Sequence, residues 1–278
     1  MEKGVKFLLL ITCLASLHEK LCECFQTSCI SNDFKTSRTA HSPQHVINQL
    51  ANIKPYNKLQ NLERLHMSNQ EWVSRPRITF VTGNSNKLKE VRMIVQSSMD
   101  SCLEVSNREI DLPEFQGEAE TISKEKCKLA AETVGGPVIV EDTSLCFNGI
   151  GGMPGPYVKW FHQSIGNDGM YRMLDGFGDK TGYAQCALSF SLGPGHEPET
   201  FLGVAHGRIV KPELDSGFGW DPIFMPNGYS VTFSQMEKVE KNKISHRSQA
   251  LKMFKEYLQK NPEILEKIRQ SSVLSMEK

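Results

Sequence analysis

Four separate groups of polar residues in this chain could bind a phosphorylated ligand or a divalent cation: Lys87, Glu114, the adjacent pair Glu141-Asp142, and the basic stretch 241–247. Hard divalent cations such as Mg²⁺ prefer carboxylate oxygens and leave coordination positions for water and phosphate. The pair Glu141-Asp142 is therefore a plausible set of metal ligands. Lysine and arginine side chains could neutralise the charge of a phosphorylated ligand nearby.

The turn before Lys87 has the features of a phosphate-binding site. The apolar run 78–81 predicts a buried strand, and residues from Leu88 onward recur at helical spacing, so the turn joins a strand to a helix. Such a junction brings backbone N–H groups and the positive end of a helix dipole to one point. A plain strand-to-helix connection remains the alternative, because the P-loop and G-x-G-x-x-G spacings are both absent. The residues of this candidate phosphate cradle are Thr82, Gly83, Asn84, Ser85, Asn86 and Lys87.

The candidate carboxylates follow a second predicted strand or lie on a loop. Residues 138–140 form a short apolar strand that delivers Glu141, Asp142 and Thr143 at its carboxyl end, where open α/β sheets place ligands. Glu114 is predicted to lie on a loop, since a neighbouring proline and glycine exclude regular structure there. A solvated loop acid or a helix cap is the alternative role for each.

The basic stretch 241–247 lies at the start of a predicted helix, for which Ser245 is the expected N-cap. Positive charge is not needed there to balance the helix dipole, so its placement favours an anionic ligand over a solvated basic loop. Phe218 and Trp220 flank glycines outside any periodic pattern, and a flat base could stack on either ring, with core packing as the alternative. The histidines interpreted as structural or surface residues are His162, His196 and His206.

The elements that must position these residues alternate between helix and strand, which indicates an α/β fold. Alternating apolar residues over 184–192, a Gly-Pro-Gly turn and a second run over 200–210 predict a β-hairpin. The other predicted elements are a helix over 88–95, a strand over 103–110, helices over 122–134 and from 158, and a last helix that begins after Ser245 and ends at Pro262.

Composition excludes several classes of protein. With 278 residues and 39% hydrophobic content, the chain can bury one sizeable core or two modest lobes. Lys+Arg and Asp+Glu both total 32, so no overall charge favours nucleic acid or an anionic membrane as partner. The eight cysteines have no zinc-ligand spacing, and the four after residue 100 are interpreted as small buried hydrophobic residues in a reduced protein.

The first 76 residues are predicted to be a leader or an extension. Residues 1–24 combine Lys3 and Lys6 with an apolar run too short to span a bilayer, which is typical of a secretory signal or of a buried or interfacial helix. Residues 25–76 are acid-poor and hydroxyl-rich, like a transit peptide or a disordered extension. Together they resemble a two-part leader to a plastid-type organelle, whereas an internal start at Met67 would give a cytosolic product.

In combination, six sequence blocks resemble the inosine triphosphate pyrophosphatase family. The resemblance covers about residues 77–260, and the order and spacing of the blocks both fit. The blocks are Thr82-Gly83-Asn84 with Lys87, Asp111-Leu112-Pro113-Glu114 with Gln116-Gly117-Glu118, Val140-Glu141-Asp142-Thr143, Gly151-Gly152-Met153-Pro154-Gly155-Pro156-Tyr157 with Lys159-Trp160-Phe161, Phe218-Gly219-Trp220-Asp221-Pro222, and Lys241-Asn242 with Ser245-His246-Arg247.

The resemblance implies a fold and an activity. The expected fold is an α/β protein with an elongated mixed sheet flanked by helices, and with two lobes whose cleft holds the active site. The expected reaction is hydrolysis of ITP, dITP and XTP to the monophosphate and pyrophosphate with Mg²⁺, or Mn²⁺ as a substitute, which keeps deaminated purines out of DNA and RNA. The catalytic domain would span 77–262, followed by a tail at 263–278. The expected assembly is a homodimer without a membrane span, and the family resemblance implies the cytoplasm as its compartment.

The resemblance also implies roles for individual residues. Glu114 and Asp142 would hold the metal, and Asp142 would be the base that activates water, with Glu141 sharing that duty. The triphosphate would meet residues 82–87, Lys126 and Lys159. The remaining expected substrate contacts are Thr143, Phe218, Gly219, Trp220, Asp221, Lys241, His246 and Arg247.

Two other functions compete with this interpretation. A non-catalytic nucleotide-binding module would keep the glycines, lysines and aromatic residues but could lose the carboxylates, and Glu114 and Asp142 are present. A metal-dependent phosphodiesterase acting on nucleic acid is disfavoured by the neutral charge balance and the absence of a basic stripe in the sequence.

Overall fold

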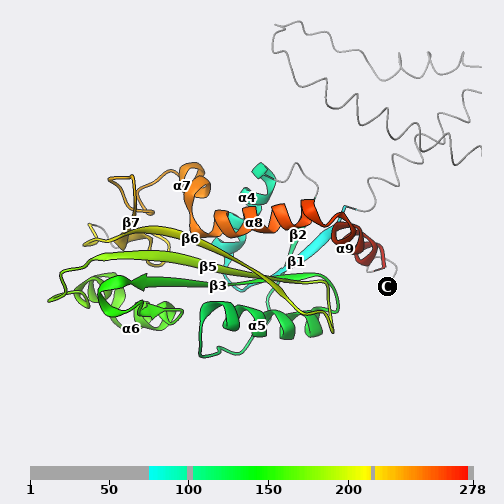
Figure 1. Ribbon diagram of the computed structural model, residues 1–278, viewed down its shortest axis with the longest axis horizontal. Helices are drawn as coiled ribbons and strands as arrows, with labels where there is room; N and C mark the ends of the chain where they lie inside the picture. The colour runs from blue at the N-terminus through cyan, green and yellow to red at the C-terminus, as the bar shows by residue number, and fades with distance from the viewer. Residues whose placement is uncertain (1–74, 99–102, 214–216, 275–278) are drawn as a thin grey trace, which may run out of the picture. The chain divides into compact units, whose positions relative to one another are not determined.

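The computed structural model describes residues 75–98, 103–213 and 217–274 (Figure 1). The predicted leader at 1–24, the internal start at Met67 and nearly all of the extension at 25–76 lie outside the described residues. Within the described ranges, no helix combines the length and the apolar character that crossing a membrane requires.

In the described part of the chain, seven strands form one mixed sheet, and the spatial order of the main path is β2-β1-β3-β5-β6-β7. Strand β1 pairs in parallel with β2 and β3, and the remaining pairs are antiparallel. Strand β4 pairs with β3 outside this path. The predicted mixed sheet is therefore confirmed, and the division into two lobes stays a prediction. The strands are β1 (Arg77–Val81), β2 (Glu104–Arg108), β3 (Val138–Phe147), β4 (Pro154–Gly155), β5 (Thr181–Ser191), β6 (Glu199–Ile209) and β7 (Phe224–Pro226).

Helices cover both faces of this sheet. Helix α5 lies on one face, α4, α7 and α8 lie on the other, and α6 packs against β4 and η2 (Figure 1). Each sheet face is apolar where a helix packs on it, as for Phe190 and Phe201 beneath Phe254 of α8. The helices are α4 (Ser85–Ser98), α5 (Ala119–Val134), α6 (Val158–Arg172), α7 (Lys238–Ile244), α8 (His246–Lys260) and α9 (Pro262–Leu274), with 3₁₀ turns η1 (Asn148–Ile150) and η2 (Asp221–Ile223).

The predicted β-hairpin is confirmed as β5 and β6, but the predicted end of β3 is wrong. Strand β3 continues to Phe147, because β5 pairs with all ten of its residues, whereas β1 pairs only with Val138 and Ile139. Glu141 and Asp142 therefore lie in the middle of a strand, just beyond the last pairing with β1. Their side chains point to opposite faces of the sheet, since successive residues of a strand alternate.

The region expected to be a tail begins with a helix that the sequence analysis did not predict. Helix α9 packs beside β1, where the Arg77 N–H donates to Ser272 Oγ at 2.8 Å. Ile268 of α9 is fully buried in the same apolar cluster as Ile78 and Phe80. The helix α9 is thus part of the core that supports the first strand.

Truncation of Ile268 tests this anchor. We expect Ile268→Ala to lower the free energy of unfolding by about 2–5 kcal/mol, because it removes a fully buried side chain and leaves a cavity. Urea unfolding followed by circular dichroism measures the change. The exposed neighbour Lys267→Ala is the matched control and should stay within about 0.5 kcal/mol of the parent protein. Equal stability of the two variants would contradict the proposed anchor.

Candidate active site

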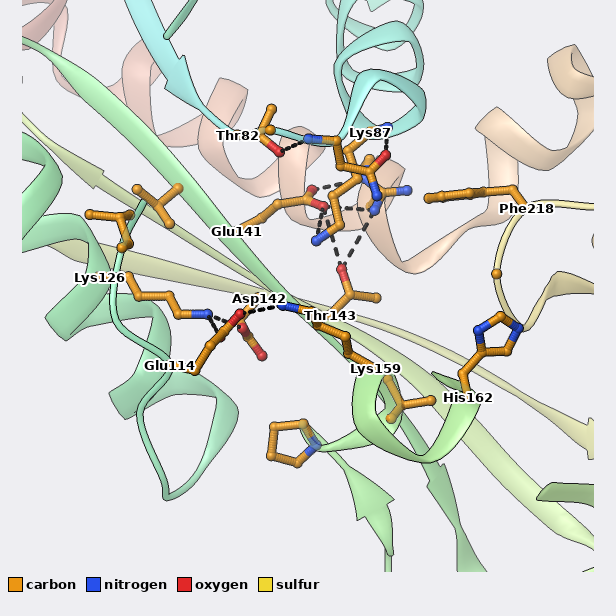
Figure 2. A pocket seen from close by; sticks show the side chains of 18 of the residues that line it. Thr82, Lys87, Glu114, Lys126, Glu141, Asp142, Thr143, Lys159, His162 and Phe218 are labelled. Atoms are coloured by element: carbon orange, nitrogen blue, oxygen red, sulfur yellow. Dashed lines mark hydrogen bonds and ion pairs between the residues drawn. The ribbon is translucent and has the colours of Figure 1, made fainter. Parts of the chain in front are cut away.

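A cavity of about 870 Å³ brings the predicted groups together (Figure 2). It lies between the turn before α4, the Glu114 loop, the middle of β3, the start of α6, the loop before η2, and the helices α7 and α8. The predicted site residues that line it are Thr82, Gly83, Asn84, Ser85, Lys87, Glu114, Lys126, Glu141, Asp142, Thr143, Lys159, Phe218, Gly219, Trp220, Asp221, Lys241, His246 and Arg247. Asn86 is the predicted residue that does not line the cavity.

The turn before α4 is organised by Asn84. Asn84 Oδ1 accepts hydrogen bonds from the N–H groups of Asn86, at 3.0 Å, and Lys87, at 3.2 Å, while the Asn84 N–H donates to Thr82 Oγ1 at 3.1 Å. Asn84 is thus the N-cap of the helix. These three N–H groups of the cradle already have a partner, so Lys87 and the helix dipole carry more of the attraction for an anion than the sequence analysis expected.

Glu141 points to the α4 and α8 face, where cations surround it. Arg247 donates to both of its oxygens, from Nε at 2.8 Å and from Nη2 at 2.7 Å, and Lys87 Nζ lies 3.1 Å from Oε1. Burial alone would raise the pKa of Glu141, but the charges of Arg247 and Lys87 hold it far below the usual carboxyl value. Glu141 is therefore an ionised, fully paired anchor, which makes it a poor proton acceptor.

Asp142 points to the opposite face, toward α5. Lys126 Nζ donates to Asp142 Oδ1 at 3.2 Å and to Glu114 Oε2 at 2.5 Å, and Lys159 Nζ donates to Glu114 Oε1 at 2.8 Å. Burial raises the pKa of Asp142 in spite of the nearby charges of Lys126 and Lys87. Asp142 Oδ2 is buried, and it has no hydrogen-bond partner among the described residues. This oxygen is free to accept a proton or to meet a ligand, and its raised pKa suits a base.

The donor set near Asp142 fits a hard cation that also binds phosphate. Glu114 and Asp142 both reach the ammonium of Lys126, so their oxygens converge on one region (Figure 2). In the described ranges, no group of three or more His, Cys, Asp or Glu side chains could hold a metal ion. Two carboxylates alone do not fill the coordination sphere of a divalent cation, so phosphate oxygens and water would have to supply the remaining ligands.

The far end of the cavity is built from aromatic rings and a buried histidine. The His246 ring lies 5.4 Å from that of Trp220 and 6.1 Å from that of Phe233, measured between centroids. Burial lowers the pKa of His246 well below its usual value, and the charges of Arg247 and Lys241 lower it further. Neutral imidazole carries one N–H donor and one acceptor nitrogen. Both nitrogens are buried without a partner among the described residues, which suits a ligand that hydrogen-bonds there.

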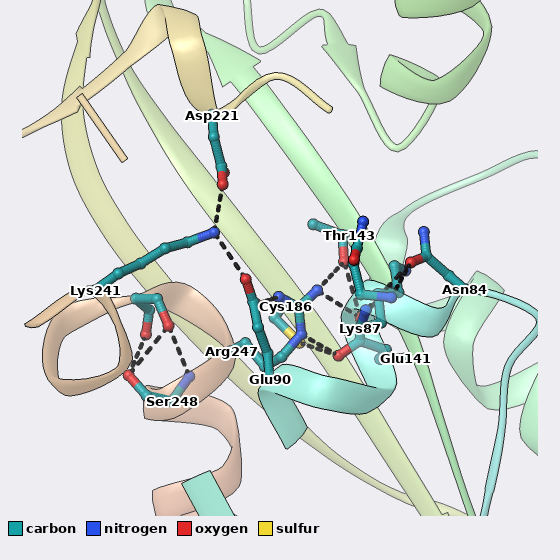
Figure 3. A network of polar contacts seen from close by, with 12 residues as sticks. Asn84, Lys87, Glu90, Glu141, Thr143, Cys186, Asp221, Lys241, Arg247 and Ser248 are labelled. Carbon is teal, nitrogen blue, oxygen red and sulfur yellow. Dashed lines mark hydrogen bonds and ion pairs between the residues drawn. The ribbon is translucent and has the colours of Figure 1, made fainter. Parts of the chain in front are cut away.

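A chain of ion pairs joins this end to α4. Lys241 Nζ lies 2.5 Å from Asp221 Oδ2 and 2.9 Å from Glu90 Oε1, and Glu90 also pairs with Arg247 Nη1 (Figure 3). Helix α4 thereby carries Lys87 and Glu90 one turn apart, both directed at the same buried network. The sequence analysis did not identify Glu90 as a member of this network.

The sequence analysis also missed several residues that line the cavity. His162, interpreted as structural or as a surface residue, lines the cavity on α6, one turn after Lys159, and points into the same space as Phe218 (Figure 2). The i, i+3 spacing from Lys159 was a signal that could have indicated this. The further lining residues that were not predicted include Glu109, Asp111, Trp160 and Gln163.

Three described cysteines are confirmed as buried thiols. Cys127, Cys146 and Cys186 are buried and free of disulfides. Burial raises the pKa of the Cys127 thiol to about 12, so it stays protonated. The fourth, Cys102, lies outside the described residues.

The two adjacent carboxylates are expected to affect stability in opposite directions at pH 7. The pKa of Asp142 is raised in the native state, so its ionised form opposes folding above that pKa, and Asp142→Asn should leave stability equal or higher. The native pKa of Glu141 is lowered, so it stabilises the fold above its unfolded value near 4.5, and this contribution is lost as the pH falls. Glu141→Gln should cost about 3–5 kcal/mol, because Arg247 stays buried without its main partner.

Urea unfolding of both variants at pH 7 and pH 4 measures these effects. The difference between Asp142→Asn and the parent protein should shrink at the lower pH, where the native Asp142 is more protonated. Thr133→Ala, an exposed substitution on α5, controls for nonspecific change. Equal destabilisation by the two carboxylate variants at pH 7 would refute the opposite roles.

Comparisons with known proteins match the region that forms this cavity. The model of the Ham1 family matches residues 78–257. A relative from Podospora anserina, named inosine triphosphate pyrophosphatase, is 49% identical over 187 residues, which are 67% of this chain and 96% of the relative.

Solved structures show the same fold. A HAM1 protein from Coxiella burnetii has a TM-score of 0.58 at 24% identity, and the match covers 66% of this chain and 98% of that one. The Ham1 protein from Staphylococcus aureus has a TM-score of 0.54 at 24% identity, with the same coverage of both chains.

Proposed function

Since this chain belongs to the Ham1 family, we propose that it hydrolyses deaminated purine nucleoside triphosphates, namely ITP, dITP and XTP, to the monophosphate and pyrophosphate. The name of the Podospora anserina relative supports this substrate class. The observation that carries the proposal is that the two ends of the cavity differ in their chemistry. At one end lies Asp142, a carboxylate suited to act as a base and flanked by cations, and at the other end lie the two nitrogens of His246, which have no partner among the described residues.

The cationic end of the cavity fits a triphosphate. Lys87, Lys126 and Lys159 line it from three different helices, and the N-terminus of α4 adds its dipole. Phosphoryl transfer needs charge on the phosphate oxygens to be neutralised and the reacting groups to be held in line. In the structure, Glu114, Asp142 and Glu141 balance these lysines.

Glu114 and Asp142 are the residues that would hold Mg²⁺, with Mn²⁺ as a possible substitute. A bound divalent cation supplies charge neutralisation on phosphate oxygens and orients them. Lys126, which now contacts both carboxylates, is positioned to turn its ammonium toward the phosphate when those carboxylates have another cation as partner.

Asp142 is the proposed base. Its free Oδ2 accepts a proton from the water that attacks the α-phosphorus. The bond from the α-phosphorus to the oxygen that bridges to the β-phosphorus then breaks, and pyrophosphate leaves with the electron pair. Glu141, held ionised by Arg247 and Lys87, anchors these cations and does not share the proton transfer.

Arg247 is the proposed reader of the purine six-position, together with His246. Its contacts with Glu141, Glu90 and Thr143 use four of the five N–H groups that a guanidinium carries, which leaves one Nη1 N–H for a ligand. A six-position carbonyl accepts this hydrogen bond. The amino group of adenine cannot, and arginine has no acceptor to offer it, so ATP is disfavoured.

The reaction is tested with a panel of nucleoside triphosphates in the presence of Mg²⁺, scoring pyrophosphate against orthophosphate. We expect pyrophosphate from ITP, dITP and XTP, far less from ATP, and loss of activity with a chelator. Asp142→Asn should lose at least about 100-fold in kcat, in the range typical of a lost general base. Release of orthophosphate alone would overturn the reaction type.

Base selection is tested with Arg247→Lys. Lysine keeps a positive charge beside Glu141, but its three N–H donors cannot keep both bonds to Glu141 and the bond to Glu90 while offering a further donor. We expect the ratio of kcat/KM for ITP to that for ATP to fall about tenfold or more, the worth of one charge-assisted hydrogen bond. Arg208→Lys, at an exposed arginine of β6, is the control and should keep the ratio. An equal loss for both substrates would remove Arg247 from base selection.

A further inference from the structure

Three small residues form a row across the sheet beneath the first turn of α8. Thr143 of β3 is paired with Cys186 of β5, and Cys186 is paired with Gly203 of β6. Paired residues of neighbouring strands project from the same face of a sheet. This is the face on which α8 packs and toward which Glu141, two residues before Thr143, also points.

Gly203 allows the backbone of α8 to touch the sheet. A Cβ atom at this position would lie 2.0 Å from the carbonyl oxygen of His246 and 2.4 Å from the nitrogen of Ala250. Both atoms belong to backbone, so neither can turn aside as a side chain could. Any residue larger than glycine must therefore lift or tilt the first turn of α8, which carries His246 and Arg247.

Cys186 and Thr143 hold in place Glu141, the carboxylate that binds Arg247. Cys186 Sγ donates to Glu141 Oε2 at 3.6 Å, and Thr143 Oγ1 donates to Glu141 Oε1 at 3.4 Å (Figure 3). Thr143 Oγ1 also accepts from Arg247 Nη2 at 3.5 Å. Burial raises the pKa of the Cys186 thiol well above its usual value, so the thiol keeps the proton that it donates. Glu141, which binds the guanidinium of Arg247, is thus itself positioned by hydrogen bonds from two side chains of the sheet.

We propose that the row Thr143, Cys186 and Gly203 positions the guanidinium of Arg247, and with it His246, against the base of the substrate. Gly203 sets the height of the α8 backbone above the sheet, and Cys186 and Thr143 set the place of Glu141, to which Arg247 is bound. Of the three, Thr143 lines the cavity, whereas Cys186 and Gly203 are buried outside its described lining and act through Glu141 and α8. This inference rests on the proposed function, because it concerns the residue assigned to base selection.

Gly203→Ala tests the positioning role of the row, and the same substitution at another buried glycine, Gly182, serves as the control. Gly182 of β5 is also buried, and a Cβ there would lie 2.4 Å from the carbonyl oxygen of Cys146, away from α8. We expect Gly203→Ala to lower the ratio of kcat/KM for ITP to that for ATP about tenfold or more, since small misplacements of binding groups have effects of this size. Gly182→Ala should lose stability but keep the ratio within about twofold. An unchanged ratio in folded Gly203→Ala would overturn the proposal.

Cys186 provides a second test that introduces no added bulk. Cys186→Ala removes the donor to Glu141, while Cys186→Ser keeps a donor of similar shape. We expect the alanine variant to raise KM for ITP and to lower the ITP to ATP ratio several-fold, with little change in kcat, and we expect serine to restore both. Identical ratios in the parent protein, Cys186→Ala and Cys186→Ser would contradict a positioning role.

A structural measurement separates failure of this inference from failure of the proposed function. If the parent protein itself does not prefer ITP to ATP, the proposed base selection is wrong. Crystal structures of the parent protein and of Gly203→Ala then still decide the positioning, by the location of the His246 carbonyl and the Arg247 guanidinium relative to β6. Displacement of both groups in Gly203→Ala supports the inference, and superimposable groups overturn it.

Discussion

The buried ion pair between Arg247 and Glu141 is the interaction on which the arrangement of the cavity depends. Both side chains are almost fully inaccessible, at 2% and 1% exposed, so each charge would be very costly without the other. Helix α4 stabilises the pair further, because its Lys87 forms an ion pair with Glu141 and its Glu90 forms one with Arg247. Two helices and the central strand must therefore meet at one point, and that point lies in the wall of the cavity.

The alternation of β3 converts two neighbouring acids into groups with opposite properties. Glu141 faces α4 and α8, where cations hold its pKa low, whereas Asp142 faces α5, where burial raises its pKa. One carboxylate is thereby committed to structure, and the other keeps an oxygen free for chemistry. The sequence shows both acids as equals, and only the pleat of the strand together with the partners on each face distinguishes them.

Periodic patterns in the sequence allowed much of the fold to be predicted. Features that depend on strand pairing or on contacts between distant elements could not be predicted in this way. The strand before Gly83, the β5 and β6 hairpin and the Ser245 cap follow from local residue types, and the structure has all three. The length of β3 could not be predicted, because it depends on pairing with β5, which lies more than thirty residues away in the chain. The membership of Glu90 in the site depends in the same way on α7 and α8, whose ammonium and guanidinium groups meet it only in the folded protein.

The two ends of the cavity are connected through Glu141, and this connection bears on how substrate binding can support hydrolysis. Lys87 lies at the turn that we propose to bind phosphate, yet its ammonium contacts Glu141, which also holds Arg247, the proposed reader of the base. In the proposed function, an incoming triphosphate would compete with Glu141 for Lys87, and an incoming base would accept a hydrogen bond from Arg247. Changes at either end therefore alter the same carboxylate. Binding energy from a correct base can in this way contribute to placing cations at the reacting phosphate, whereas a base that leaves Arg247 unpaired contributes less.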